Sequence, residues 1–368
     1  MKIILIRIMQ AALAVLYAPM KLLKAKNRIV YLSRQSDDKS VDMLLLERAV
    51  SELSPDTKQV FRLRTIPDGL LPKLGYAFSI LGDMFYLATS KVAILDTYSI
   101  PVSCLRHKKC LKVVQMWHAL GAVKKFGLQS LGTKEGRDES VSRAMRMHKN
   151  YDYIIAPSKA TMKFYEEAFG YDESVFEILS LPRVDAIVNN RSTESFYREN
   201  PEMADEKVVL YLPTFRENES YAVGALMSEF DDGMDGYRLI VKTHPLFSKV
   251  KDKERYSFSG DFDTYDLMKS ADIIVTDYSA CAFEASLLMK PLYFFTPDYE
   301  KYERERGINI DLRSEMPSAV FDEADALCNA IKNEEYDIPM LYSFKNKYIE
   351  NSGGDNAEKL AGFIIGLM

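Results

Sequence analysis

Several residue types and motifs are scarce or missing in this 368-residue chain. Its four cysteines are widely spaced and form neither a C-x-x-C pair nor a Cys/His cluster with zinc spacing, which favours free thiols in a reducing compartment. The H-E-x-x-H, P-loop and G-x-S-x-G motifs are absent, and no D-x-D follows a predicted strand, so no metal-dependent or cofactor-dependent scheme emerges. A net charge of -5 gives no sign of general nucleic-acid affinity.

What is present indicates a globular α/β protein with two domains. The hydrophobic fraction is 47% and the charged fraction 27%, and the length exceeds what one core usually supports. Apolar strand-like runs alternate with helical patterns, which predicts parallel sheets built from βα units. The predicted strands cover residues 29–33, 91–96, 112–116, 153–157, 208–213, 238–242, 272–277 and 291–295.

A polar stretch over 185–207 separates the first four strands from the last four and predicts the crossing between domains. The expected architecture is two doubly wound, Rossmann-like domains facing a central cleft, over residues 28–190 and 191–368. The second domain is expected to include the terminal helices.

Residues 1–27 form a separate N-terminal segment in which 3–20 are apolar apart from Arg7 and Gln10. The run is near the length needed to span a bilayer, and basic residues flank it on both sides. Because burying Arg7 in lipid would be costly, an amphipathic helix lying on an anionic membrane surface fits better. A true span, a helix packed on its own domain and a cleaved signal peptide stay open, although no clean small-x-small cleavage site is present.

Two of the four histidines lie where predicted strands end. His118 follows the only tryptophan, Trp117, in a small-residue turn, and His244 follows the run 239–243. Sites in open α/β sheets form at such ends, so both are candidates for proton transfer or charge stabilisation. His107 and His148 stand in basic, helix-like contexts and are expected to be exposed.

Other strand ends carry groups suited to phosphate. Ser279 in Asp277-Tyr-Ser279 is a plausible N-cap, and a helix start is a ready anion site, although capping alone would also explain it. Ser158 is expected only to cap a helix. Arg216 could bind a phosphate oxygen or be an ordinary loop arginine.

The motifs together resemble a known family. Q-M-W-H-A-L-G-A-V-K-K-F-G, Y-L-P-T-F-R, K-T-H-P, A-D-I-I-V-T-D-Y-S-A and K-P-L-Y-F-F-T-P-D-Y-E-K-Y-E-R-E-R-G occur in the order found in CDP-glycerol glycerophosphotransferases of teichoic acid synthesis. They run from about residue 115 to 307. The resemblance implies a GT-B fold and a peripheral, monotopic enzyme on the cytoplasmic face of the cell membrane.

The same resemblance implies transfer of glycerol phosphate or ribitol phosphate from a CDP-polyol, with release of CMP. The acceptor would be an undecaprenyl-type lipid-linked saccharide or a growing teichoic acid-type polymer. Two alternatives stay open, namely a GT-B glycosyltransferase that uses a nucleotide sugar and a catalytically silent membrane scaffold. The chain carries little beyond the two expected domains, which favours a primase over a processive polymerase.

Roles carried over from the family fall on the matching positions. His118 would be the base that deprotonates the acceptor hydroxyl, and His244 would hold the diphosphate. The donor side would include Arg216 and Lys242 at phosphate, Asp277, Ser279 and Ala280 at the helix start, and Glu284 at the ribose, where the family commonly has aspartate.

The sequence departs from the family's usual W-H-G-x-P-x-K. Ala119 replaces the glycine, no proline follows, and Lys124 falls one position later than the family's lysine. Lys124 and Lys125 could attract phosphate or form a solvated face. D-Y-S-A also lacks the second serine of D-Y-S-S. These departures predict that Trp117, Ala119 and Lys124 shape a loop with a different polyol or acceptor preference.

Overall fold

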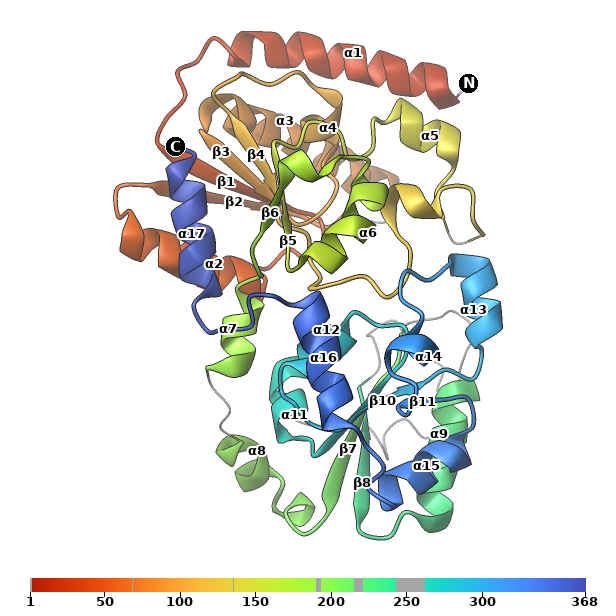
Figure 1. The fold of residues 1–368 in the computed structure, drawn as a ribbon. Helices are drawn as coiled ribbons and strands as arrows, with labels where there is room; N and C mark the ends of the chain where they lie inside the picture. Colours follow the sequence, from red (N-terminus) through yellow and green to blue (C-terminus); the bar gives the residue numbers. More distant parts are fainter. Residues whose placement is uncertain (1, 68, 135, 190–192, 215–220, 243–261) are drawn as a thin grey trace. The chain divides into compact units, whose positions relative to one another are not determined.

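The structure is a computed structural model that describes all residues except 1, 68, 135, 190–192, 215–220 and 243–261 (Figure 1). The chain divides into two compact units. The first comprises Met1–Leu120, Phe126–Asp185 and Asp355–Met368, and the second comprises Gly121–Lys125 and Ala186–Gly354. Each unit contains one parallel sheet, so the predicted α/β class is confirmed.

The first sheet has the strand order β2-β1-β3-β4-β5-β6 with every pair parallel. Apolar residues fill β3 and the centre of β1, and both strands are buried along their whole length because helices cover both faces. The chain leaves β1 toward β2 on one side and returns to β3 on the other, so a topological switch point lies between β1 and β3. The strands are β1 (Arg28–Ser33), β2 (Lys58–Leu63), β3 (Val92–Leu95), β4 (Lys112–Gln115), β5 (Tyr153–Ala156) and β6 (Phe176–Ile178).

Helices of the first unit begin at recognisable sequence signals. Ser158 accepts a hydrogen bond from the backbone N–H of Thr161, 3.0 Å away, so it caps α6 as expected, and Gly170 ends that helix in the left-handed region. The helices are α1 (Lys2–Met20), α2 (Val41–Leu53), α3 (Leu70–Thr89), α4 (Ile100–Cys104), α5 (Glu139–Ala144), α6 (Lys159–Phe169) and α17 (Asn356–Gly366), with 3-10 turns at Gly127–Ser130 and Glu173–Val175. Helix α7 (Arg183–Val188) begins in the first unit and ends in the second.

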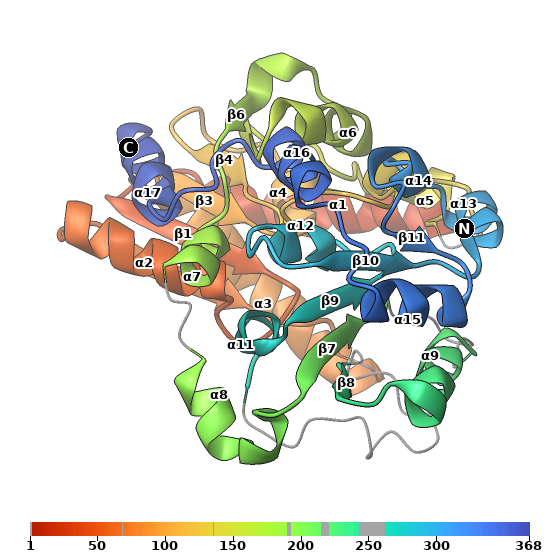
Figure 2. The same cartoon turned by 60° about the horizontal axis from the view of Figure 1, so that its bottom comes forward.

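The second sheet has the order β11-β10-β9-β7-β8, again parallel, with its switch point between β7 and β9. Helices α9 and α15 pack together on one side of the strands, and α12 packs with α16 on the other (Figure 2). The strands are β7 (Lys207–Leu212), β8 (Tyr237–Val241), β9 (Ile273–Thr276), β10 (Leu292–Phe295) and β11 (Val320–Phe321).

In the second unit α8 (Glu194–Glu199) precedes β7, and the other helices follow the strands along the chain. These other helices are α9 (Tyr221–Gly233), α11 (Thr264–Ser270), α12 (Cys281–Ser286), α13 (Tyr299–Arg306), α14 (Leu312–Glu315), α15 (Ala324–Lys332) and α16 (Ile338–Tyr348), and a 3-10 turn lies at Pro201–Met203. All eight predicted strands are present, whereas β2, β6 and β11 were not predicted.

The units depart from the expected boundaries at several places, since the first unit includes the N-terminal segment and ends at Asp185 instead of residue 190. The last helix, α17, was assigned to the second domain but packs on α2 in the first unit (Figure 1). Buried Asp185 explains this return, because its carboxylate accepts hydrogen bonds from the backbone N–H groups of Asn356 and Ala357 at 2.9 and 2.8 Å. It thereby satisfies two donors at the start of α17. The short segment Gly121–Lys125 also departs from expectation, because it belongs to the second unit.

Candidate functional site

The turn after β4 holds the tryptophan in a backbone conformation that its residue type rarely adopts. Trp117 has φ 61°, in the left-handed region. Buried Gln115 supports the turn, since its Oε1 accepts a hydrogen bond from the Trp117 backbone N–H at 2.9 Å. The indole ring stacks on Phe126 with centroids 4.9 Å apart and meets Phe169 edge-on. Such a backbone costs about 1–3 kcal/mol, which the ring contacts offset.

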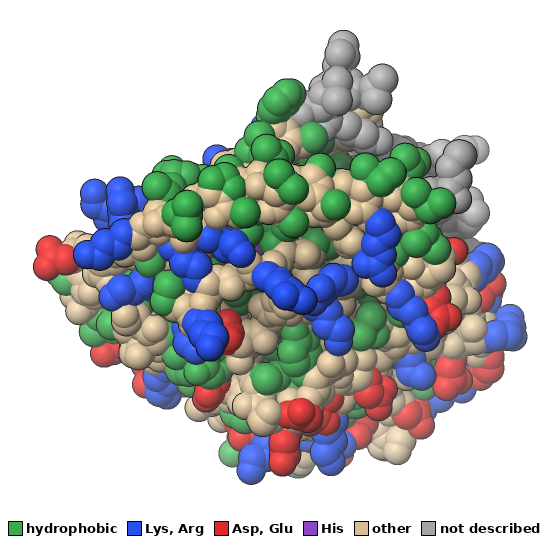
Figure 3. Space-filling model, turned by 90° about the horizontal axis from the view of Figure 1, so that it is seen from above, with side chains coloured by type: hydrophobic (Ala, Val, Ile, Leu, Met, Phe, Trp, Pro, Cys, Tyr) green, Lys and Arg blue, Asp and Glu red, His purple; other side chains and the backbone are tan. Residues whose placement is uncertain are grey.

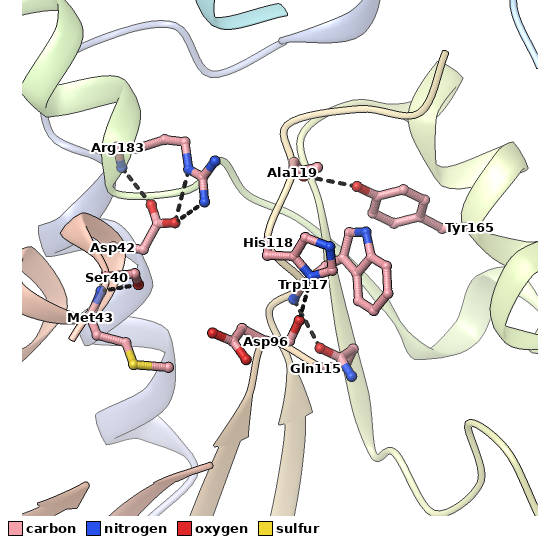
Figure 4. A network of polar contacts seen from close by, with 10 residues as sticks. All are labelled: Ser40, Asp42, Met43, Asp96, Gln115, Trp117, His118, Ala119, Tyr165 and Arg183. Atoms are coloured by element: carbon pink, nitrogen blue, oxygen red, sulfur yellow. Dashed lines mark hydrogen bonds and ion pairs between the residues drawn. The ribbon is translucent and has the colours of Figure 1, made fainter. Parts of the chain in front are cut away.

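His118 is held in one tautomer by the main chain. Its Nδ1 lies 2.7 Å from the backbone carbonyl oxygen of Asp96, at the end of the neighbouring strand β3 (Figure 4). Because a carbonyl can only accept, Nδ1 carries the proton and Nε2 carries a lone pair. Burial lowers the pKa of His118 to about 4, opposed by the bond to Asp96. The imidazole is therefore neutral near pH 7, as a general base requires.

An ion pair between distant parts of the sequence lies beside this histidine. The backbone N–H and Nε of Arg183 donate to the two carboxylate oxygens of Asp42 at 2.7 and 2.9 Å (Figure 4). Both side chains are largely buried, with exposures of 13% for Arg183 and 2% for Asp42. The cation lowers the pKa of His118 and the carboxylate raises it, so the pair acts electrostatically on the imidazole.

Sequence reasoning missed both members of this pair. Arg183 follows Pro182 closely after β6, as Arg216 follows Pro213 after β7. Strand β6 has only three residues and was not predicted, so Arg183 did not directly follow any predicted strand. Asp42 lies in the first turn of α2, and nothing near it in sequence indicates a partner 141 residues away.

Asp96 supplies a second buried carboxyl group in the same region. Its side chain is 3% exposed, and Oδ1 has no hydrogen-bond partner among the residues that the structure describes. Burial raises the pKa of Asp96 to about 6, while Ser33 and Thr97 oppose the shift through hydrogen bonds. The sequence placed Asp96 at the end of a strand but gave it no role.

The residues after His118 are divided between the two units. The Ala119 carbonyl accepts a hydrogen bond from the Tyr165 hydroxyl at 2.9 Å, which fixes the turn on α6. Gly121 begins the segment of the second unit, where an added Cβ would lie 2.4 Å from the ring of Phe283, so only glycine fits. Lys124 then forms an antiparallel bridge with Ile308. The main chain of this loop is therefore fixed by packing, whatever its lysines bind.

The second unit places another predicted group at its own switch point. Asp277, buried at the end of β9, accepts hydrogen bonds from the backbone N–H of Thr214 at 3.0 and 2.9 Å and from its hydroxyl at 2.5 Å. Thr214 follows β7, the adjacent strand. The carboxylate thus ties together the two loops where ligands of doubly wound sheets bind.

The helix start after Asp277 differs from its prediction. Helix α12 begins at Cys281, so Ala280 occupies the N-cap position instead of Ser279. The Ser279 hydroxyl accepts a hydrogen bond from the Cys281 backbone N–H at 3.3 Å, which leaves it close to the helix start without capping it. Glu284 is buried within α12.

The remaining predictions have mixed outcomes. The Lys242 ammonium donates to the Phe262 carbonyl at 2.9 Å, and partial burial lowers its pKa. His244 and Arg216 lie outside the described residues. The prediction that His148 is exposed is wrong, because its ring is 3% exposed among aromatic side chains and burial lowers its pKa to about 3. His107 is also largely enclosed, bonded to the Tyr17 hydroxyl at 2.9 Å.

No group of three His, Cys, Asp or Glu side chains is placed to bind a metal ion within the described part of the chain. A family model described as CDP-Glycerol:Poly(glycerophosphate) glycerophosphotransferase matches residues 15–366. The chain belongs to this family. As a glycerophosphotransferase family member it is a transferase, which confirms the resemblance read from the motifs.

Similar proteins agree with this membership. A teichoic acid ribitol-phosphate primase of Bacillus spizizenii is 29% identical over 99% of the chain and 98% of its own length. A teichoic acid glycerol-phosphate primase of Bacillus subtilis is 28% identical over 77% of the chain and 76% of its own length. The wall teichoic acid polymerase TagF has a structure that matches with a TM-score of 0.73 at 19% identity, over 99% of this chain and 97% of that one. The glycerophosphotransferase family member therefore has the two-domain GT-B fold.

Proposed function

We propose that this chain transfers a polyol phosphate from a CDP-polyol to a hydroxyl group of a lipid-linked saccharide or a growing teichoic acid-type polymer, releasing CMP. In this reaction the acceptor oxygen forms a bond to the β-phosphorus while the bond to the bridging oxygen of CMP breaks. The acceptor proton goes to a base on the protein. The neutral His118, with Nδ1 fixed on Asp96 and a free lone pair on Nε2, is the observation that carries the proposal.

The environment of His118 supports a role as the base. A pKa of about 4 makes the free imidazole a weak base, but a phosphate-bearing substrate beside it would stabilise the imidazolium and raise that pKa. Trp117 and Ala119 hold the turn from either side through the indole stack and the Tyr165 bond. Proton transfer by such a group contributes about 100 to 10,000-fold to the rate.

The donor is assigned to the second unit. Asp277 fixes the loop after β7, and Ser279, Ala280 and Glu284 follow on the chain into α12. We assign binding of the diphosphate to this helix start together with Lys124, Arg216, Lys242 and His244. We assign binding of the ribose to Glu284. The similar proteins include both a ribitol-phosphate and a glycerol-phosphate primase, so both CDP-ribitol and CDP-glycerol are candidate donors.

We also propose peripheral, monotopic attachment to the cytoplasmic face of the cell membrane through α1. This helix is long and apolar enough to cross a membrane, with a mean hydropathy of 1.9, and only Tyr17 is buried in it. Ile4, Leu5, Ile8 and Val15 are 60–72% exposed. Figure 3 shows a ridge of hydrophobic side chains with a band of Lys and Arg beside it.

The arrangement suits a helix lying in the interface. Exposed Lys24 and Lys26 follow α1 in the chain, and Lys21, directly after the helix, donates to the Arg106 carbonyl in a loop that also carries exposed Lys109. The first acidic residue of the chain is Asp37. Cations next to exposed apolar residues favour anionic headgroups, worth about 1 kcal/mol per cation near the surface.

The proposed activity is tested by CMP release with purified protein in detergent. CDP-glycerol, CDP-ribitol and a UDP-sugar are each offered with lipid-linked saccharide acceptors of defined length. Release of CMP with one of the CDP-polyols, dependent on acceptor, is expected. Transfer from the UDP-sugar alone would identify a glycosyltransferase, and no release with any donor would favour a scaffold; either result would contradict the proposal.

A further inference from the structure

A cavity of about 220 Å³ lies in the first unit at the carboxyl ends of β1, β2 and β3. It has no part in the donor and base assignments made above. The walls come from the loops that follow the three strands and from helices α3 and α4. Its place is the switch point between β1 and β3, where open α/β sheets bind their ligands.

The charges that line this cavity are predominantly positive. Arg34, Arg62 and Arg64 contribute three guanidinium groups, and Asp83 is the single acidic residue in the lining. Hydroxyl groups of Ser33, Thr97 and Ser99 lie on the same walls. Guanidinium and hydroxyl donors around a small volume are the groups that bind phosphate oxygens.

The three arginines differ in how many of their hydrogen-bond donors are already used within the protein. Arg62 is fixed, since its Nε donates to Asp83 at 2.8 Å and a terminal nitrogen donates to the Ser79 carbonyl at 2.9 Å. Arg34 lies over the Tyr98 ring at 5.1 Å, and its buried Nε has no hydrogen-bond partner among the described residues. Arg64 is exposed. Tyr76 accepts a hydrogen bond from the Arg34 side chain, so Arg64 and the remaining donors of Arg34 are left for a ligand.

The surroundings indicate an amphiphilic ligand. Helix α3 presents Tyr76 and Asp83 to the cavity, yet Phe78 and Phe85 of the same helix are 73% and 40% exposed. Helix α1, the proposed membrane contact, packs along α3. A lipid chain on this apolar surface could therefore continue into a phosphate group inside the cavity.

The cavity also shares a loop with the candidate base. The Asp96 carbonyl holds His118, and Thr97 and Ser99, which follow directly, line the cavity. The Arg34 backbone N–H donates to the Thr97 hydroxyl at 3.2 Å, so the loops after β1 and β3 are joined. A ligand in the cavity would be held by the same loop that orients the imidazole.

We propose that Arg34 and Arg64 bind the phosphate or diphosphate group of the lipid-linked acceptor, with the fixed Arg62 adding positive charge to the same cavity. The identity of the ligand rests on the proposed function, whereas the anion site itself does not. The lipid end would lie toward α3 and α1, and the saccharide would extend from the cavity toward His118. The cavity would thus recognise the part of the acceptor that all lipid-diphosphate saccharides share, independently of the polyol transferred.

Direct binding tests the site without relying on activity. Farnesyl diphosphate, farnesol and inorganic pyrophosphate are titrated calorimetrically into the full chain, the Arg34→Gln and Arg64→Gln variants, and Arg48→Gln as a control. Arg48 pairs with Glu52 on an exposed face of α2. We expect the Arg34→Gln and Arg64→Gln variants to bind farnesyl diphosphate at least about tenfold more weakly than the unaltered chain does, and Arg48→Gln to bind it equally well. Equal binding in all four proteins would overturn the anion site.

The other two ligands show whether the site prefers a lipid diphosphate or a free anion. Weaker binding of pyrophosphate and of farnesol than of farnesyl diphosphate supports a lipid headgroup, whereas pyrophosphate binding as tightly as farnesyl diphosphate would overturn the lipid assignment. Arg64→Lys keeps the charge and should recover part of the affinity, which a folding defect would not allow. In the CMP-release assay the glutamine variants should raise the acceptor KM with an unchanged donor KM.

Discussion

The Nδ1–H of His118 donates to the backbone carbonyl of Asp96 across 2.7 Å, linking the ends of the neighbouring strands β4 and β3. A main-chain acceptor cannot rotate or ionise, so it fixes the tautomer of the imidazole without adding charge. The Asp96 side chain can therefore vary independently of the bond. In the proposed reaction, orientation comes from the backbone and electrostatic tuning from Asp42 and Arg183.

Replacement of the candidate base should abolish most turnover. His118→Ala should lower the rate of CMP release by at least about 100-fold, because the acceptor hydroxyl loses its proton acceptor. Circular dichroism should show an intact fold. His107→Gln is the matched control, since His107 bonds to Tyr17 of α1 instead of lining the turn, and it should retain most of the activity in detergent. Near-normal turnover of His118→Ala would refute the assigned role.

The acid limb of the pH profile should respond to Arg183. In the free protein His118 is neutral above about pH 4, so kcat/KM should fall as pH decreases through that value. Arg183→Met removes the cation that lowers the pKa of His118 and leaves Asp42, which raises it. The acid limb should therefore move to higher pH.

Arg183→Lys separates charge from structure in this experiment. Breaking a buried pair costs about 3–5 kcal/mol, so Arg183→Met should also unfold at lower denaturant concentration. Lysine keeps the positive charge and should leave the acid limb near its original position. A profile that is the same in all three proteins would show that Arg183 has no electrostatic effect on the titrating group.

Asp96 should make stability depend on pH. Its pKa is raised to about 6, so the folded state binds the proton more tightly than the unfolded chain, and its ionisation weakens the fold as pH rises from about 4 to above 6. Asp96→Asn should therefore increase stability at pH 7.5 by about 1–3 kcal/mol, with little change at pH 4. Urea unfolding at both pH values measures this difference. A variant that is less stable at pH 7.5 would refute the prediction.

The sequence predicted the central strands well because buried parallel strands are continuous apolar runs. Strand β2 escaped prediction because Lys58, Gln59 and Arg62 interrupt its apolar residues, and β6 because it has three residues. Helix α17 was placed in the wrong unit because Asp185, the acceptor at its start, lies 171 residues away in sequence. The residue pattern of a segment indicates whether it forms a helix or a strand. The element on which it packs depends on contacts between residues far apart in sequence.

The candidate site was predictable to a similar extent. Trp117 and His118 stand together after an apolar run, and Asp277 follows another, so sequence alone singles them out. The pair Asp42 and Arg183 joins α2 to α7, and only the folded chain brings it beside the imidazole. The unusual φ of Trp117 could not be predicted either, because left-handed backbone is rare for tryptophan.

The left-handed backbone of Trp117 should invert the usual order of stability of its alanine and glycine variants. Trp117→Ala and Trp117→Gly both lose the stack on Phe126, which should cost about 3 kcal/mol. Glycine normally destabilises relative to alanine, but at φ 61° it avoids the Cβ strain. Trp117→Gly should therefore unfold at a higher denaturant concentration than Trp117→Ala. The opposite order would mean that the turn relaxes when the indole is removed.

Attachment through α1 should depend on both its apolar face and nearby cations. Sedimentation with vesicles containing phosphatidylglycerol should bring down the unaltered chain. The double variant Ile4→Asp/Ile8→Asp should remain in the supernatant, because two charges would replace side chains that are 65% and 60% exposed.

The cations near α1 are tested separately. Lys24→Gln/Lys26→Gln should weaken binding to these vesicles without changing the weaker binding to neutral phosphatidylcholine. The double variant Leu44→Asp/Leu53→Asp is the control for loss of exposed apolar side chains in general. These leucines lie on α2, and their replacement should not affect sedimentation.

Extraction with alkaline carbonate distinguishes an interfacial helix from a membrane span. Release of the unaltered chain by carbonate would accord with a helix lying in the interface, whereas retention would indicate a span and contradict monotopic attachment.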